Sequence, residues 1–489
     1  MEYWKKYIFN PIYKLKNDKD RILLMNKRNF GSNTILHFLH PVHAILLCMF
    51  NGDQNLETKI KTIADFYEIS INEAISLIKP IIENNNEIYF KYLGVTFTFP
   101  PKTLIENTEN IIRTDLNIQE YIITDKLDFR RRRLSSPINM LICINLRCYT
   151  DCIYCYANKN VQYKPLSTQK WIDIIHEAKN IGIETLDITG GEFFMQPGWY
   201  DISSTILECG YTPEISTKVP LSEHTLRQIK DVGLKKLQYS LDTLDCDIAI
   251  TNYKVKKDYI KNFIQSIRMA DKLGLSIIIK STLDRNTCNQ RNVANIINFA
   301  ITLSNIERCV FSVTGYSCYK STNNYSLIKP SLDMIYEVVE YIKCRSKYVE
   351  FPLYDDTYFY SKKDLQNYSS FIKRAQCTAN IDGLVVLPDG KITICEELYW
   401  NNNFIIGNIN NNSLIEIWNS PKATNLWNLQ SKDFPVSSPC KTCLGFNECR
   451  HGKGVCWKMV IAAYGHNNVL YPDPRCPKAP KIINNFTID

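Results

Sequence analysis

Three cysteines in one short stretch constrain this chain more than any other feature of its sequence. Cys148, Cys152 and Cys155 lie in a single segment, and no fourth cysteine is close by. A four-iron cluster takes four thiolate ligands, and a structural zinc ion takes four ligands of cysteine or histidine type. Three thiolates therefore leave one corner of a metal centre open, where a small molecule can coordinate. The stretch predicts a reactive metal centre, with a zinc knuckle as the alternative.

The spacing C-x3-C-x2-C, with Tyr154 just before the last cysteine, resembles the signature of radical SAM enzymes. The resemblance implies an oxidoreductase in which the three cysteines hold a [4Fe–4S] cluster. It also implies that the fourth iron binds S-adenosylmethionine (SAM) and reduces it to a 5′-deoxyadenosyl radical. Tyr154 is then expected to lie against the cofactor.

Length and composition describe a globular chain of several domains. The 489 residues exceed one ordinary core, so two to four domains are expected. A hydrophobic content of 45% and a charged content of 22% exclude a disordered chain. The apolar run at 44–50 is too short to span a bilayer and no signal segment opens the chain, so we expect a cytoplasmic protein.

Charge and cysteine usage narrow the class further. The net charge of +8 is mild, and the basic run at 130–133 fits a solvated face or an anionic peptide better than nucleic acid. Eighteen cysteines in a reducing compartment favour metal binding over disulfides. Ten of them fall into two clusters. The other eight are expected to be small buried side chains: Cys48, Cys143, Cys209, Cys246, Cys288, Cys309, Cys318 and Cys344.

Residues 1–105 predict a small winged-helix-like domain. The pattern predicts a hairpin over 13–25, a helix between Pro41 and Asn51, helices over 56–67 and 70–82, and strands over 88–92 and 95–99. The order and the motifs His40-Pro41, Asn51-Gly52-Asp53 and 64–67 resemble the PqqD-like recognition element of enzymes that modify ribosomal peptides. That resemblance implies capture of a precursor's leader peptide as an added strand. A DNA-binding winged helix is disfavoured, because the third helix is acidic.

After a linker at 106–136, residues 137–325 alternate strands with helices, which predicts a partial (β/α)6 barrel of α/β class. A helical bridge is expected over 326–376. The expected strands are 139–145, 185–189, 214–219, 237–242, 276–283 and 308–313, and the helices begin near Ser167, Gly198, Ser222, Lys256 and Asn289. Sites in this architecture form at the carboxyl ends of the strands. The cysteine loop directly follows the first strand.

The later strand ends carry polar groups that fit a cofactor site. Gly190, Gly191 and Glu192 follow the second strand, and by resemblance this motif holds the amino group of SAM. Ser216, Ser240 and Asp242 end the third and fourth strands and are implied to line the ribose and methionine parts. Lys280, on the fifth strand, either pairs with the cofactor carboxylate or extends into solvent.

A second cysteine set occupies residues 377–489 and resembles a SPASM iron–sulfur domain. The resemblance implies two auxiliary [4Fe–4S] clusters, making three clusters in the chain. Cys440, Cys443, Cys449 and Cys476 would hold one, and Cys377, Cys395 and Cys456 the other. The spacing from Cys449 to Cys456 departs from the pattern, and the second cluster has no evident fourth ligand. Water, a distant cysteine such as Cys344, or a thiolate of the substrate are the candidates.

These parts together imply a maturase of a ribosomally synthesised peptide that forms thioether (sulfur-to-carbon) crosslinks and draws electrons from a flavodoxin or ferredoxin. Carbon–carbon crosslinking and formylglycine-type modification are alternatives within the class, and a non-enzymatic iron–sulfur winged-helix regulator is the alternative outside it. Glu396, beside Cys395, is the candidate catalytic proton acceptor; a solvated surface glutamate is the other interpretation.

Overall fold

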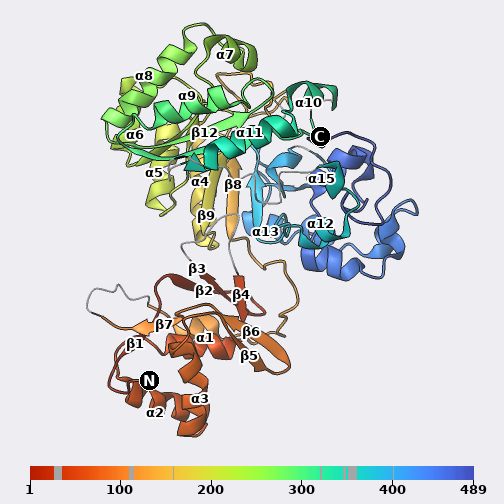
Figure 1. Ribbon diagram of the computed structural model, residues 1–489. Helices are drawn as coiled ribbons and strands as arrows, with labels where there is room; N and C mark the ends of the chain where they lie inside the picture. The colour runs from red at the N-terminus through yellow and green to blue at the C-terminus, as the bar shows by residue number, and fades with distance from the viewer. Residues whose placement is uncertain are drawn as a thin grey trace. The chain divides into compact units, whose positions relative to one another are not determined.

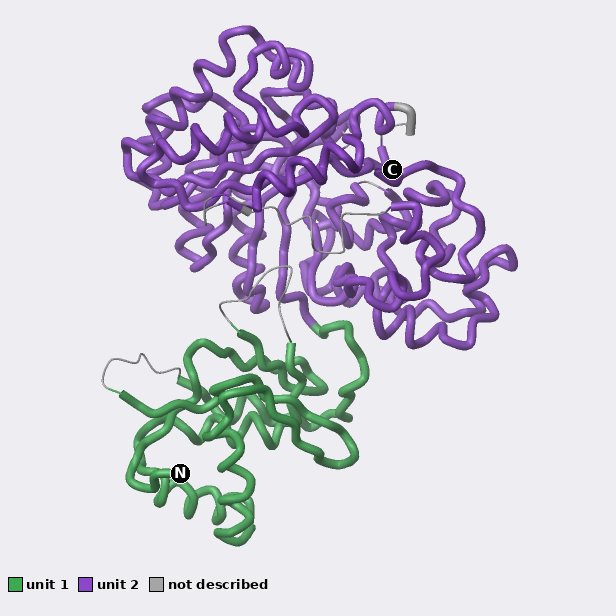
Figure 2. Tube along the Cα trace, viewed as in Figure 1, with its two compact units in different colours: residues 1–135 green, residues 136–489 purple. Residues whose placement is uncertain are grey.

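The computed structural model describes residues 1–26, 36–108, 115–157, 159–319, 322–343, 345, 349–350, 361–399 and 401–488. The chain forms two compact units, unit 1 over Met1–Ser135 and unit 2 over Ser136–Asp489 (Figure 2). Each unit is described by itself below. Cys344, a candidate cluster ligand in the sequence, lies outside the described residues.

Unit 1 combines short antiparallel strands with helices (Figure 1). The strands β2 (Tyr13–Asn17), β3 (Ile22–Asn26) and β4 (Leu36–Leu39) form one sheet in that order. Two further pairs are β1 (Tyr7–Phe9) with β7 (Leu104–Glu106), and β5 (Ile88–Tyr92) with β6 (Val95–Phe99). The helices are α1 (Pro41–Cys48), α2 (Leu56–Tyr67) and α3 (Ile71–Ile82). The expected hairpins and helices are present, whereas β1, β4 and β7 were not predicted.

Local chemistry explains where these helices begin. At the start of α3, the Ser70 hydroxyl accepts from the backbone N–H of Glu73 (3.3 Å), and the Glu73 carboxylate accepts from the backbone N–H of Ser70 (2.8 Å). This capping box satisfies backbone donors that a helix leaves unpaired. One apolar face of α3, including Ala74, Ile78 and Ile81, is then buried in the unit's core.

Part of the expected linker is bonded to unit 1. Arg21 is fully buried and pairs with Asp18 at 3.0 Å. Its guanidinium also donates to the carbonyls of Asp128 (3.4 Å) and Arg133 (3.3 Å), and the backbone N–H of Ser135 donates to Asp18 (2.7 Å). The polar turn between β2 and β3 therefore anchors residues 128–135, so the compact unit extends to 135.

Unit 2 contains the expected strand–helix repeat. The parallel strands are β8 (Asn139–Cys143), β9 (Thr185–Thr189), β10 (Ser216–Thr217), β11 (Lys236–Ser240), β12 (Ser276–Leu283), β13 (Ile306–Val313) and β14 (Val349–Glu350). Helices α4 (Thr168–Asn180), α5 (Trp199–Glu208), α6 (Glu223–Asp231), α7 (Cys246–Tyr253), α8 (Tyr259–Lys272) and α9 (Gln290–Ala300) lie between them in the chain (Figure 1). The expected helix starts agree with the structure; α7 and β14 were not predicted.

The strands do not close into one continuous sheet. Strands β10 to β14 form one five-stranded sheet, and no backbone pairing among the described residues joins β9 to β10. Strand β10 is only two residues long, shorter than the expected 214–219. Pro213 and Pro220 flank it, and proline cannot donate to a strand ladder. The six expected strands therefore divide between two sheets.

The cysteine-rich region completes the second sheet. Strand β15 (Gly383–Val386) pairs in parallel with β8, and β16 (Lys391–Thr393) and β17 (Ile405–Asn408) extend the sheet in the order β17-β16-β15-β8-β9. Helices α10 (Thr322–Ile328), α11 (Leu332–Lys343) and α12 (Tyr368–Lys373) precede β15, and α13 (Leu414–Trp418), α14 (Pro421–Trp427) and α15 (Trp457–Tyr464) follow β17. One core buries residues of both regions, including Trp171 and Trp418.

Candidate functional site

The three-cysteine loop lies at the carboxyl end of β8 and is fixed by backbone hydrogen bonds to the end of α7. The backbone N–H groups of Asp151 and Ile153 donate to the carbonyls of Tyr253 (2.8 Å) and Asn252 (2.9 Å). The ammonium of Lys159 donates to the carbonyl of Thr150 (3.2 Å) within the loop. These bonds hold the loop from two sides.

Two of the three thiols in this loop lie near the Thr150 hydroxyl. The Thr150 hydroxyl lies 3.6 Å from the Cys148 sulfur and 3.3 Å from the Cys152 sulfur. Burial lowers the pKa of Lys159, but the nearby thiols of Cys155, Cys148 and Cys152 raise it by more. The described residues contain no group of three or more Cys, His, Asp or Glu side chains arranged to hold a single metal ion. Cys148, Cys152 and Cys155 are all free thiols on one loop, and thiolates are the donors that a four-iron cluster takes, so the donor set fits such a cluster.

Two glycines let β9 approach this loop. A Cβ atom on Gly191 would lie 1.9 Å from the carbonyl oxygen of Arg147, and Gly190 has a φ of +121° that favours glycine. The backbone N–H groups of Gly191 and Glu192 donate to the carbonyls of Asn145 and Arg147, both at 2.7 Å. The glycines are therefore needed for the packing of the motif against the entry to the cysteine loop, whatever their role toward a cofactor.

Glu192 is a buried carboxylate that is already bound by backbone donors. It is 2% exposed and accepts from the backbone N–H groups of Lys218 (2.9 Å) and Phe194 (3.3 Å). Burial raises the pKa of Glu192 to about 7, although both hydrogen bonds lower it. The carboxylate thus joins the end of β9 to the residue that follows β10, and its expected contact with the amino group of SAM stays a prediction.

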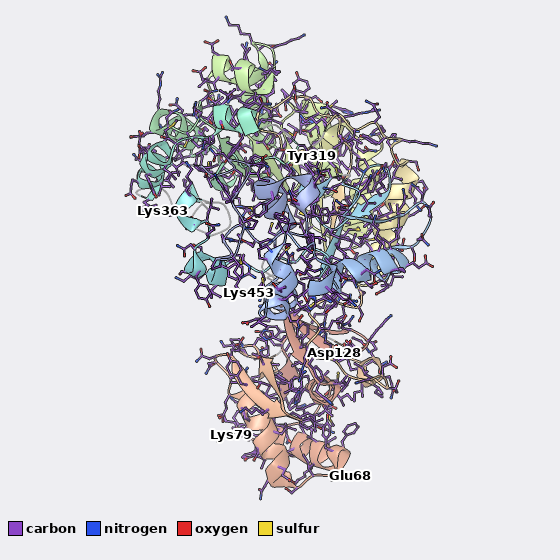
Figure 3. The ribbon with its side chains drawn as sticks, turned by 90° about the vertical axis from the view of Figure 1, so that its right-hand side faces the viewer. Glu68, Lys79, Asp128, Tyr319, Lys363 and Lys453 are labelled. Atoms are coloured by element: carbon purple, nitrogen blue, oxygen red, sulfur yellow. The ribbon has the colours of Figure 1, made fainter. Side chains whose placement is uncertain are left out.

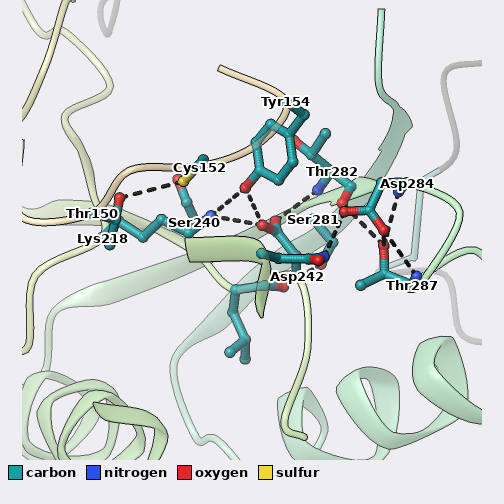
Figure 4. Close-up of polar contacts among 12 residues, drawn as sticks. Thr150, Cys152, Tyr154, Lys218, Ser240, Asp242, Ser281, Thr282, Asp284 and Thr287 are labelled. Atoms are coloured by element: carbon teal, nitrogen blue, oxygen red, sulfur yellow. Dashed lines mark hydrogen bonds and ion pairs between the residues drawn. The ribbon is translucent and has the colours of Figure 1, made fainter. Parts of the chain in front are cut away.

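Lys218, Asp242 and Tyr154 form a buried network beside the loop (Figure 4). The Lys218 ammonium lies 2.6 Å from Asp242 and 2.5 Å from the Tyr154 hydroxyl, and that hydroxyl donates to Asp242. Asp242 also accepts from the backbone N–H of Thr282 (2.8 Å). Burial lowers the pKa of Lys218, but Asp242 and then Cys152 raise it by more, so the lysine is a cation next to the thiols.

The sequence predicted Tyr154 and Asp242 as cofactor residues and placed Lys218 at the polar end of the third strand, but it did not predict that Lys218 pairs with Asp242. The available signal was a lysine at the end of an apolar strand, in Ser216-Thr217-Lys218. A buried lysine requires a partner anion, and Asp242, at the end of the next strand, provides it.

The other predicted cofactor residues lie elsewhere on the same strands. Lys280 pairs with Glu214, which also pairs with Arg308 at 2.5 Å. Lys280 is therefore engaged within the sheet and is not part of the Lys218–Asp242 network. Ser240 accepts a hydrogen bond from Gln238 (2.9 Å), and Ser216 is opposite Gln238 in the β10–β11 pair.

Four of the C-terminal cysteines line one cavity. The cavity has a volume of about 420 Å³, and its lining includes Cys440, Cys443, Cys449 and Cys476. Arg374 donates to the Cys449 sulfur (3.1 Å), and Arg450 lies 3.6 Å from the Cys440 sulfur. Four thiols and two cations around one space fit an anionic cluster held by four thiolates.

The remaining three cysteines lie on segments near one another. Gly454 brings the chain close to Cys377, since a Cβ on Gly454 would lie 3.3 Å from the Cys377 Cβ, and Cys456 caps helix α15 two residues later. Burial raises the pKa of Cys395 well above its usual range, and the neighbouring Cys456 raises it further. Cys377 thus lies near the segment that leads into Cys456, and Cys395 is near Cys456; their joint role as ligands of one cluster stays a prediction.

Glu396 is partly buried and directly follows Cys395. Burial and, to a lesser degree, Glu397 raise the pKa of Glu396, Lys458 lowers it, and the net result is a pKa of about 7. Glu397 is neutralised by Lys458 at 2.5 Å. Asp187 on β9 also raises the pKa of Glu396, which indicates that Glu396 is near that strand. The catalytic role of Glu396 stays a prediction.

Comparison with known families agrees with both cysteine regions. Residues 142–284 match the Radical SAM superfamily. Residues 377–444 match SPASM, the iron–sulfur cluster-binding domain. The chain is an enzyme with a radical SAM domain. The two domains imply SAM and iron–sulfur clusters as its cofactors.

Two groups of curated relatives resemble this radical SAM enzyme. The PqqA peptide cyclase of Rhizobium meliloti (strain 1021) is 24% identical over 361 residues, which cover 71% of this chain and 89% of the relative. The GTP 3′,8-cyclase of Nautilia profundicola is 25% identical over 167 residues, 32% of this chain and 51% of the relative.

A solved structure shares the fold across nearly the whole enzyme. Streptococcus suis SuiB has a TM-score of 0.59 at 18% identity, covering 96% of this chain and 99% of SuiB. The same protein bound to its precursor peptide SuiA gives a TM-score of 0.58. Within the described part of the chain, no helix combines the length and apolar character needed to cross a bilayer.

Proposed function

We propose that this radical SAM enzyme is a maturase that crosslinks residues of a ribosomally synthesised precursor peptide. The observation that carries the proposal is the joint placement of an incomplete three-thiol loop and two further cysteine sets on one continuous fold. Two relatives support the substrate class, since one is named a peptide cyclase and SuiB has been crystallised with a precursor peptide.

The residues around the loop have distinct proposed roles. A [4Fe–4S] cluster and SAM bound at Cys148, Cys152 and Cys155 would supply a 5′-deoxyadenosyl radical that removes a hydrogen atom from the peptide. Lys218 holds the Tyr154 hydroxyl and Asp242, so that the aromatic ring of Tyr154, within the loop, keeps one orientation. Glu192, Ser216, Ser240 and Asp242 line the proposed SAM site. The C-terminal cysteines would hold two more clusters, giving three, with a flavodoxin or ferredoxin as electron donor.

Two bond types fit a peptide crosslinker. The first is a thioether, in which the sulfur of a precursor cysteine bonds to a carbon and two hydrogen atoms are lost. The second is a carbon–carbon bond, with the same loss of hydrogen. A thioether route through the Cys377 set would need an open iron corner there for the substrate thiolate, whereas a carbon–carbon bond needs none.

Unit 1 is the proposed holder of the leader segment. Among the described residues, β2 and β4 are the edge strands of its three-stranded sheet. An extended peptide can pair with such an edge through backbone hydrogen bonds. Holding the leader raises the local concentration of the core peptide at unit 2, typically to about the millimolar range for a short link.

Mass spectrometry of a co-expressed precursor, before and after thiol alkylation, tests the proposal. A crosslinked peptide should be lighter by two hydrogen atoms per bond. If its cysteines still react with the alkylating reagent, the bond is carbon–carbon; if they no longer react, the bond is a thioether. A precursor of unchanged mass, in the presence of SAM and a reductant under anaerobic conditions, would contradict peptide crosslinking.

A further inference from the structure

Cys318 belongs to none of the three cysteine sets and was expected to be a small buried side chain. It is only partly buried and lies in the segment that follows β13. Its thiol donates to the carbonyl of Lys458 (3.7 Å), and its own carbonyl lies 3.0 Å from His466 Nε2. Lys458 is two residues beyond Cys456, so the thiol of Cys318 points toward the start of α15.

The residues on either side of Cys318 in the chain form hydrogen bonds to the segment after Cys395 and to the residue after the three-cysteine loop. The hydroxyl of Tyr319, labelled in Figure 3, donates to the carbonyl of Tyr399, four residues beyond Cys395. Ser317 donates to the carbonyl of Tyr156 (3.1 Å), directly after the three-cysteine loop. Residues 317–319 therefore lie between the loop and the segments that contain Cys395 and Cys456.

Hydrogen bonds and one ion pair connect Cys318 to both cysteine-bearing segments. Its thiol is bonded to the carbonyl of Lys458, two residues beyond Cys456. The ammonium of Lys458 pairs at 2.5 Å with Glu397, which is two residues beyond Cys395. The segments that contain Cys395 and Cys456 therefore meet at Lys458, where the Cys318 thiol also lies.

Cys143 is a second scattered thiol near this region, and Tyr399 and Glu396, on the segment that follows Cys395, both affect its pKa. Cys143 is fully buried, and its thiol lies 3.9 Å from the carbonyl of Asn145 and 3.2 Å from the position of a Cβ on Gly190. It therefore packs against the β9 glycine motif.

We propose that Cys318 is the fourth thiolate ligand of the auxiliary cluster held by Cys377, Cys395 and Cys456. The inference rests on the proposed assignment of that cluster. On ligation, the Cys318 thiol releases its proton to solvent and its sulfur donates an electron pair to iron in place of water, with no change of oxidation state. Lys458 offsets part of the negative charge of the four thiolates. The cluster then has no open iron, and a precursor cysteine cannot bind to it.

The test uses the full chain with Cys148, Cys152 and Cys155 changed to Ala, so that only the auxiliary clusters contribute to the spectrum. Electron paramagnetic resonance of the reduced protein is recorded with and without cyanide, which binds an open iron corner. The background chain should show no cyanide-induced shift. Cys318→Ala in that background should show one, while Cys143→Ala and Cys309→Ala should not.

Several outcomes would overturn the inference. A cyanide-induced shift in the background chain itself would mean that one iron of the Cys377 cluster has an open coordination position. That measurement is made with Cys318 unsubstituted. A shift produced by Cys143→Ala instead would assign the ligand to that thiol. If Cys318→Ala does not retain its clusters, Cys318→Ser offers an oxygen ligand of similar size, and an unchanged spectrum in that variant would also contradict ligation. Peptide crosslinking is measured separately, so its failure would leave the spectroscopic result standing.

Discussion

Lys218 is the single residue on which the polar network beside the cysteine loop most depends. In Lys218→Met, Asp242 would remain 1% exposed without its cation. Removing one partner of a buried ion pair typically costs about 3–5 kcal/mol, so unit 2 should lose about that much stability. Urea unfolding of the cluster-free protein, followed by tryptophan fluorescence, measures the change. Lys261→Met, on the exposed side of α8, is the control, and equal stability of the two variants would contradict the prediction.

Glu396 is the second residue with a testable individual role. Glu396→Gln keeps the size of the side chain but cannot accept a proton. Cluster content and deoxyadenosine formation should be unchanged, while crosslinked peptide should fall by about 100-fold or more, the usual contribution of a general base. Product is quantified by mass spectrometry against Glu340→Gln, which changes an exposed glutamate on α11. If the yield of crosslinked peptide does not fall, Glu396 is not the catalytic base.

At the scale of elements, helix α1 should make unit 1 sensitive to acid. His43 is 3% exposed, its Nδ1 has no hydrogen-bond partner in the described structure, and it packs against Phe97 and Phe99. Burial, and to a lesser degree His40, lower the pKa of His43 from 6.5 to about 4. The unfolded chain therefore binds a proton at a higher pH than the folded one, so stability is complete above pH 6.5 and falls as the pH decreases toward 4.

The size of this effect follows from the pKa difference. Proton linkage predicts a loss of about 3 kcal/mol from unit 1 across that window. Urea unfolding of residues 1–135, followed by circular dichroism between pH 7.5 and pH 4, gives the profile. His43→Phe keeps an aromatic ring and should show a flatter profile over the same range. Identical slopes for the two proteins would mean that His43 does not carry the effect.

The sheet of unit 1 is the element expected to recognise the substrate. Residues 1–135 alone should bind the leader half of a precursor encoded beside the gene about as tightly as the full chain, because strand addition uses only that sheet. Calorimetry compares the two proteins with a chain that lacks residues 1–135, and a scrambled leader serves as the control. Equal binding with and without unit 1 would place leader recognition in unit 2.

At the scale of the whole molecule, the three cysteine sets should be separable. Changing Cys148, Cys152 and Cys155 together to Ala should abolish deoxyadenosine formation, because only that loop leaves a corner for SAM. Much of the iron should remain, since Cys440, Cys443, Cys449 and Cys476 line a separate cavity. Chromatography of deoxyadenosine and iron analysis give the two readouts. Deoxyadenosine formed at the parental rate would contradict the assignment of the loop.

The sequence by itself determined the features that depend on neighbours along the chain. The capping box at Ser70 and Glu73 fixes the start of α3, and the succession of apolar strands and amphipathic helices gives the strand–helix repeat of unit 2. The spacing of Cys148, Cys152 and Cys155 places three thiols in one loop, and this does not depend on where the loop lies in the fold. These signals are local, because helix caps, strand patterns and loop spacings are set by residues a few positions apart.

Only the tertiary structure decided which distant groups meet. Lys218 and Asp242 are 24 positions apart, Lys280 and Glu214 are 66 apart, and Cys318 and Lys458 are 140 apart. Strand β15 pairs with β8, although more than half of the sequence of unit 2 lies between them. This pairing joins the C-terminal cysteine region to the sheet that carries the three-cysteine loop. A lysine or a thiol has the same local pattern whether it is paired or solvated. Which partner such a side chain meets depends on how the sheets and helices pack, and that packing depends on the whole chain.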